Sequence, residues 1–103
     1  MSEPAEDSPT RAKLRTEVMA VGWSELVPQF ARGALLLLAG DRDLLEVAEA
    51  IALDDRARVE AWLASGGLRR AADEDARALA EAGASARFQC VIVQPWVLAQ
   101  RLA

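Results

Sequence analysis

The residues of this chain that are able to do chemistry are chiefly closely spaced aspartates and a small set of arginines. Three pairs of aspartates have the oxygen ligands and the short spacing that a metal site needs. The pairs are Asp41/Asp43, Asp54/Asp55 and Asp73/Asp75. Each pair stands at the start of an expected helix, where a carboxylate caps free N–H groups and offsets the helix dipole. We therefore expect helix capping from these pairs and no metal site.

The common catalytic groups are missing from the chain. There is no histidine, which removes the commonest general base and the commonest metal ligand. There is also no nucleophile elbow of the form G-x-S-x-G, no P-loop and no dinucleotide-binding glycine motif. The one cysteine, Cys90, stands in the apolar run FQCVIV and is expected to be a small buried side chain. The sequence predicts no catalytic residue, no cofactor and no metal ion.

Four arginines are candidate nucleic-acid contacts: Arg56, Arg58, Arg69 and Arg70. The first two would lie at the start of the second helix of a helix-turn-helix, where residues reach base edges in the major groove. Neighbouring carboxylates would be repelled by phosphate, and the net charge of −4 disfavours nonspecific attraction to nucleic acid or to an anionic membrane. Pairing of Arg56 with Glu60 and placement of Arg58 across Trp62 would account for both arginines on a solvated helix. Nucleic acid is therefore the weaker expectation.

Trp23 and Trp96 are candidate protein-interaction residues, because exposed tryptophan often anchors protein interfaces. Trp23 precedes a short helix and has a second possible role, as an apolar staple on that helix. Trp96 follows Pro95 near the end of the chain, where partial exposure is expected, with core packing as the alternative. Trp62, in contrast, shares an apolar helix face with its neighbours and is expected in the core.

Residues 1–8 are polar and contain proline, so we expect a disordered tail followed by one domain over residues 9–103. The first residues lack the apolar region of a secretory signal, and no apolar run approaches the ~20 residues of a membrane span. The expected compartment is the cytoplasm.

Ser8 followed by Pro9 predicts an N-cap and first turn of a helix. Its apolar face would carry Leu14, Val18 and Val21 at positions i, i+4 and i+7, with a stop at Gly22. A second short helix follows, in which Pro28 is tolerable only within the first turn.

The stretch from Asp43 to Arg70 predicts two short helices joined by a tight turn. Asp43 caps the first, with Glu46 completing a capping box, and Asp54 or Asp55 caps the second. A Gly-Gly pair supplies the left-handed exit. A further helix is expected over residues 73–83, capped by Asp73.

Three segments are expected to be strands of one small sheet: residues 34–39 (ALLLLA), 68–72 and 87–93. Their apolar runs would pair and bury one sheet face against the capped helices. Residues 96–103 are either an edge extension or a short terminal helix. The sequence thus predicts an α+β, winged-helix-like domain with its helices packed on a three-stranded sheet.

Four segments carry a resemblance to a known family. They are Trp23-Ser24-Glu25-Leu26 through Phe30-Ala31-Arg32-Gly33, Asp43-Leu44-Leu45-Glu46-Val47-Ala48, Asp54-Asp55 with Val59-Glu60-Ala61-Trp62-Leu63, and Pro95-Trp96-Val97-Leu98. In this order, from about Leu14 to Gln100, they resemble the bacterial domain-of-unknown-function family 2288. The resemblance implies a small single-domain bacterial protein with no assigned activity, cofactor or catalytic residue.

Residues 46–70 are more loosely similar to the helix-turn-helix of winged-helix regulators, with Gly67-Leu68 at the entry to the wing. They depart from that pattern in a shorter turn and in the helix expected after the first wing strand. The favoured function is a non-catalytic interaction module that self-associates or docks onto a protein partner. The alternative is a DNA-binding winged-helix regulator, and a small-molecule enzyme is a distant third.

Overall fold

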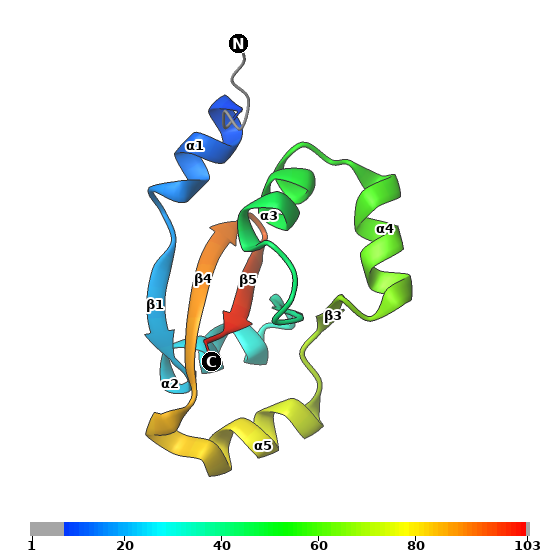
Figure 1. The fold of residues 1–103 in the computed structure, drawn as a ribbon. Helices are drawn as coiled ribbons and strands as arrows, with labels where there is room; N and C mark the ends of the chain where they lie inside the picture. Colours follow the sequence, from blue (N-terminus) through cyan, green and yellow to red (C-terminus); the bar gives the residue numbers. More distant parts are fainter. Residues whose placement is uncertain (1–7, 103) are drawn as a thin grey trace.

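The computed structural model describes residues 8–102, and its centre is a five-stranded mixed sheet with helices on both faces (Figure 1). The elements in chain order are α1 (Pro9–Arg15), β1 (Met19–Gly22), α2 (Trp23–Ala31), β2 (Leu35–Leu38), α3 (Leu44–Ala52), α4 (Arg56–Ser65), β3 (Leu68–Arg70), α5 (Asp73–Ala82), the 3₁₀ turn η1 (Gly83–Ser85), β4 (Arg87–Val93) and β5 (Trp96–Arg101). The expected tail lies outside the described residues except for Ser8, which caps α1.

The strand order is β1-β4-β5-β2-β3, and all neighbours are antiparallel except β5 and β2, which are parallel. The α+β class is confirmed, and all three expected strands form. The three-stranded sheet was wrong, because β1 and β5 add two strands and β5 separates β2 from β4. The winged-helix arrangement is not confirmed: α5 follows β3 where the second strand of a wing hairpin would stand.

Residues 96–101 are neither an edge extension nor a helix but the central strand. Leu98 of β5 is opposite Leu36 of β2 on one side and Val91 of β4 on the other. Val97, Leu98 and Ala99 are consecutive and all buried. Such a run without polar alternation is typical of a strand covered on both faces, which explains why it occupies the middle of the sheet.

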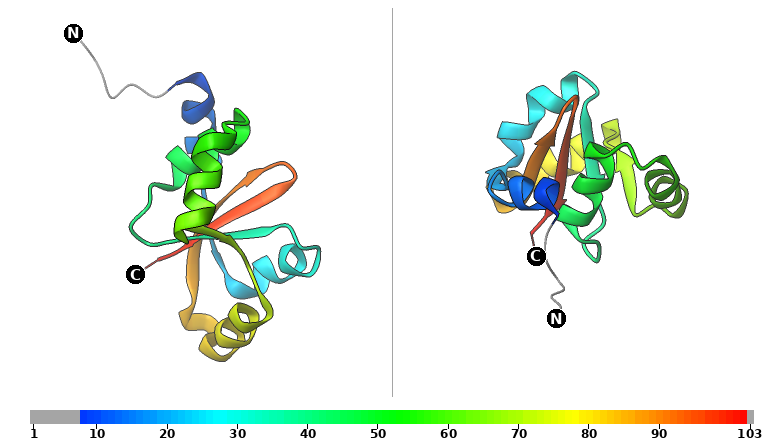
Figure 2. Two further views of the ribbon diagram at one scale, coloured as in Figure 1. Left: turned by 90° about the vertical axis from the view of Figure 1, so that its right-hand side faces the viewer. Right: turned by 90° about the horizontal axis from the view of Figure 1, so that it is seen from above.

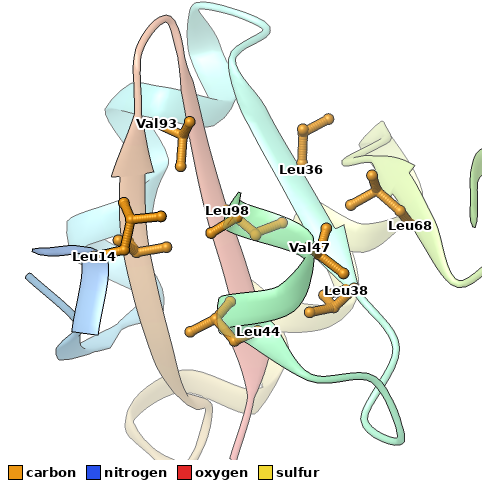
Figure 3. Packing of buried hydrophobic residues seen from close by; sticks show 10 residues of the cluster. Leu14, Leu36, Leu38, Leu44, Val47, Leu68, Val93 and Leu98 are labelled. Carbon is orange, nitrogen blue, oxygen red and sulfur yellow. The ribbon is translucent and has the colours of Figure 1, made fainter. Parts of the chain in front are cut away.

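Alternating side chains of the strands supply two cores. On one face, α1 and α3 cover Leu38, Leu68 and Leu98, and Figure 3 shows Leu44 and Val47 of α3 pointing onto this layer. On the other face, α2 and α5 cover a cluster that contains Trp23, Leu26, Leu35, Leu79, Phe88 and Cys90. A pair of helices therefore packs on each face of the sheet.

The first helix ends earlier than its apolar spacing predicts. Leu14 is buried on α1, but the helix stops at Arg15 and Val21 lies on β1. β1 pairs with β4, with Val21 opposite Phe88, so sheet pairing overrides a helical spacing that the two valines, as β-branched residues, support only weakly.

The carboxylate of Glu49 on α3 holds the start of α1. It accepts hydrogen bonds from the Ser8 hydroxyl and from Arg11, whose Nη2 lies 2.6 Å from Oε1. These hydrogen bonds lower the pKa of Glu49, the Ser8 bond most of all and the Arg11 bond next. Ser8 also caps α1 by accepting from the Arg11 N–H at 3.0 Å, as predicted.

Pro28 lies in the second turn of α2, where the sequence argument did not place it. The backbone N–H that it lacks would have bonded to the carbonyl of Ser24, which is an exposed residue. The helix is kept in place by buried Trp23 and Leu26, which pack into the second core.

The two helices of the Asp43–Arg70 stretch form as predicted. Asp43 accepts from two backbone N–H groups of α3, and Asp55 caps α4 by accepting from the Arg58 N–H at 3.3 Å. Asp54 takes a left-handed conformation (φ 58°) in the turn, and Gly66 ends α4 at φ 85°. Asp73, however, is the first residue of α5 and not its cap.

Gln100 is the buried polar residue that ties β5 to the loop before α3. Its Nε2 donates to the carbonyls of Ala39 at 2.8 Å and Arg42 at 2.6 Å, and its Oε1 accepts from Gln89 at 2.6 Å. Because each polar atom of the amide is bonded, its burial is compensated, and the loop is held against the sheet at the point where α3 begins.

We expect Leu98→Ala to lower the free energy of unfolding by about 2–5 kcal/mol, because it leaves a cavity beside a fully buried central strand. The control is Ile92→Ala on the neighbouring strand, where the side chain is 43% exposed and the loss should be about 1 kcal/mol or less. Urea unfolding of both variants measures the difference, and equal losses would contradict the central burial of β5.

Candidate functional site

α4 projects from the side of the molecule, as Figure 1 and the right view of Figure 2 show. Among the α-helices of residues 8–102 it is the one without a buried residue. Val59 and Trp62 are half-buried against the first core, while Leu63 is 47% exposed. The helix therefore covers only part of the sheet face toward which it leans.

The uncovered part of that face is a groove of about 640 Å³ between α4 and the sheet. Its floor is apolar, with Leu36 and Leu68 from the sheet and Ile51 from the end of α3. One wall is α4, and the other is the turn that leads into β5. The wall residues are Asp54, Asp55, Arg56, Val59, Glu60, Leu63, Arg70, Gln94, Pro95 and Trp96.

Arg70 and Trp96 meet in this groove because of the strand register. Leu36 is opposite Arg70 on one side and Leu98 on the other, so Arg70 and Trp96, two residues before Leu98, are on the same face of the sheet. The Arg70 guanidinium carbon lies 5.1 Å from the centroid of the Trp96 ring, within cation–π range. Trp96 is half-buried, so part of the indole lines the groove.

The other three candidate nucleic-acid arginines are paired with carboxylates. Arg58 bonds to Glu46 and lies 5.1 Å over the Trp62 ring, which confirms its placement across that ring. Arg56 lies 3.7 Å from Asp54 and not in an ion pair with Glu60, contrary to the expected i,i+4 pairing. Arg69 makes a two-pronged contact with Asp75, both N–O distances being 2.6 Å.

Asp75 is the carboxylate of this region whose pKa departs most clearly from its ordinary value. The hydrogen bonds from Arg69 lower the pKa of Asp75, and the backbone N–H of Ala72 at 2.8 Å lowers it further. The same contact raises the pKa of Arg69. Asp75 thus joins β3 to the start of α5, outside the groove.

Among the residues that the structure describes, charged groups without an ion-pair partner line both sides of the groove. Within residues 8–102, neither Glu60 of α4 nor Arg70 of β3 lies in an ion pair. Asp54 is beside Arg56, and Asp55 is bonded to the backbone of α4. Within the described residues, the rim of this apolar groove therefore carries two acids without an ion-pair partner, Asp55 and Glu60, and one such base, Arg70.

Trp23 does not reach this site, because it is 8% exposed and packs against Phe30 in the second core with a ring separation of 6.0 Å. The burial of Trp23 fits its alternative role as an apolar staple on the following helix better than a role at a protein interface. Cys90 is buried on the same side, as predicted, and its burial raises the pKa of the thiol. Of the two candidate tryptophans, the structure thus places Trp96 at the groove and Trp23 in the second core.

The groove residues that the sequence argument missed are Leu63, Glu60 and the Gln94-Pro95 turn. The sequence pattern puts Leu63 on one apolar helix face with Val59 and Trp62, although α4 has too few large apolar residues to be covered on more than one side. That shortage was the signal available in the sequence.

The part of the chain that the structure describes has no group of three or more potential metal ligands. It also has no helix that is long and apolar enough to cross a bilayer.

Comparison with family models matches residues 9–101 to the family described as protein of unknown function (DUF2288). A search of solved structures finds the NMR solution structure of PA1075 from Pseudomonas aeruginosa, with 43% identity and a TM-score of 0.79. The match covers 100% of this chain and 94% of that one. No curated protein matches the chain.

We expect Asp75→Asn to destabilise the fold by about 1 kcal/mol near neutral pH, because it weakens both the Arg69 contact and the cap of α5. The pKa of Asp75 is lower in the folded state than its ordinary value of 3.8, so the folded protein binds fewer protons there than the unfolded one. The extra stability of the wild type over Asp75→Asn is therefore complete above the ordinary pKa of 3.8 and declines as the pH falls through the lowered pKa of Asp75. Urea unfolding at neutral and acidic pH measures the difference in free energy of unfolding between the wild type and Asp75→Asn. A difference that does not change with pH would contradict the prediction.

Proposed function

The chain belongs to the DUF2288 family of proteins of unknown function, and we propose that it is a cytoplasmic, non-catalytic protein-interaction module that binds through the groove beside α4. The observation that carries the proposal is the exposure of α4. This helix has no buried residue and leaves Leu63 47% exposed over the groove, and exposed apolar surface rimmed by polar groups is typical of protein-binding sites.

The composition of the groove supports a protein partner. Trp96 with Arg70 on it is a pair of the residue types that most often dominate binding energy at interfaces. The floor is made by aliphatic side chains, and the charged groups lie along the walls, which is the usual division between interface core and rim.

We expect Leu63→Glu to abolish binding through the groove, because it places a charge over the apolar floor without disturbing the core. The matched control is Val27→Glu on α2, which changes a 42%-exposed side chain on the far side of the sheet. Light scattering after size exclusion measures self-association. Capture from the cells that encode the chain, with identification of the retained protein, measures other partners.

The proposal is supported if wild type and Val27→Glu bind the same identified protein, this chain included, and Leu63→Glu does not. It is overturned if Leu63→Glu binds as the wild type does, or if the wild type is monomeric and retains nothing. Thermal unfolding of both variants should stay near that of the wild type, since both side chains are exposed.

We expect duplex DNA to bind only in the weak nonspecific range, with a Kd of about 10⁻⁴ M or weaker near physiological salt. The reason is that three of the four candidate arginines already face carboxylates, so few counterions would be released. Titration of duplex DNA with wild type and Arg58→Ala tests this. Micromolar, sequence-preferring binding that Arg58→Ala removes would favour the DNA-binding alternative instead.

A further inference from the structure

We propose that the groove is an interface between two copies of this chain, in a two-fold dimer in which Glu60 of each copy pairs with Arg70 of the other. This inference rests on the proposed function, because it names the occupant of the same groove. Its support comes from the exposure of α4 and from the charges on the two walls.

α4 is too short to be a stable helix without packing against other parts of the protein, and none of its residues is fully buried. Isolated helices shorter than ~12–15 residues are marginal in water, and helices in proteins draw most of their stability from a packed apolar face. α4 has 10 residues and none is buried, with Leu63 at 47% exposure over the groove. A second copy laid across the groove would cover Leu63 and Trp96 and complete the packing of the helix.

The charges of the groove complement those of a second copy of the same groove. A two-fold interface brings the same patch against itself, so that residue i meets residue j and residue j meets residue i. Glu60 on the α4 wall and Arg70 on the sheet side each lack an ion-pair partner within residues 8–102. A two-fold copy supplies the missing partner of both groups at once.

Other occupants fit these charges less well. An acidic segment would meet Glu60 and two aspartates on the α4 wall, and a basic segment would meet Arg70. A fitting partner must bring a base to Glu60 and an acid to Arg70 beside an apolar patch. That is the composition of this same surface, which is why we assign the groove to a second copy.

The test is a charge exchange between two variants. Glu60→Arg alone places two arginines against each other at both pairs of a dimer, and Arg70→Glu alone places two glutamates. Each should weaken self-association on the order of 10-fold to 100-fold. A mixture of the two variants creates two attractive pairs in the mixed dimer, so mixing should restore association. Sedimentation velocity on each variant and on the mixture measures it.

The matched controls are Glu81→Arg and Arg77→Glu, the same charge changes at exposed positions of α5, on the other face of the sheet. They should leave the dimer unchanged, and circular dichroism should show all four variants folded. A wild type that is monomeric at its highest soluble concentration overturns the dimer. The dimer is also overturned if Glu60→Arg and Arg70→Glu associate as the wild type does, or if the mixture of the two variants stays monomeric. A monomer that still captures another protein in a Leu63-dependent manner overturns the dimer alone and leaves the proposed function standing.

Discussion

The rest of the structure depends on β5 being paired on both edges and packed on both faces. β1 and β4 form one antiparallel half of the sheet, β2 and β3 form the other, and β5 joins them. Its consecutive Val97 and Leu98 point into different cores, so each pair of helices packs on a layer that β5 helps to build. Gln100 extends this role to the loop before α3, because its buried amide is satisfied by that loop's carbonyls.

The groove is a consequence of how far α3 reaches along this sheet. α3 contributes three buried residues, Leu44, Val47 and Ala48, to the first core, but it ends at Ala52. The chain then enters α4 through the left-handed turn at Asp54. The next helix carries Arg56, Arg58 and Glu60 in its first turns and has little apolar surface with which to close the face. Two of the charges that make α4 a poor core helix, Arg56 and Glu60, therefore also lie on the rim of the groove.

Local signals were enough to predict most elements of this fold. Ser8-Pro9, Asp43, Asp55 and Gly66 each specify a helix boundary through a hydrogen bond or a backbone conformation, and the structure has those boundaries. The number and order of strands were not predictable in this way. β1 has a helical spacing of apolar residues, and β5 follows a proline close to β4, so only tertiary pairing assigns them. The same holds for the groove, where Arg70 and Trp96 meet through the register of three strands.

The position of β5 has a consequence for the protein while it is being made. The ribosome synthesises β1, β2, β3 and β4 before it reaches residues 96–101, and the two halves of the sheet have no hydrogen-bonded contact until those residues have left the exit tunnel. Until then the two apolar layers on which α3 and α5 pack in the folded chain are incomplete. The joining of the two halves of the sheet therefore waits for a single strand, the last of the five in chain order.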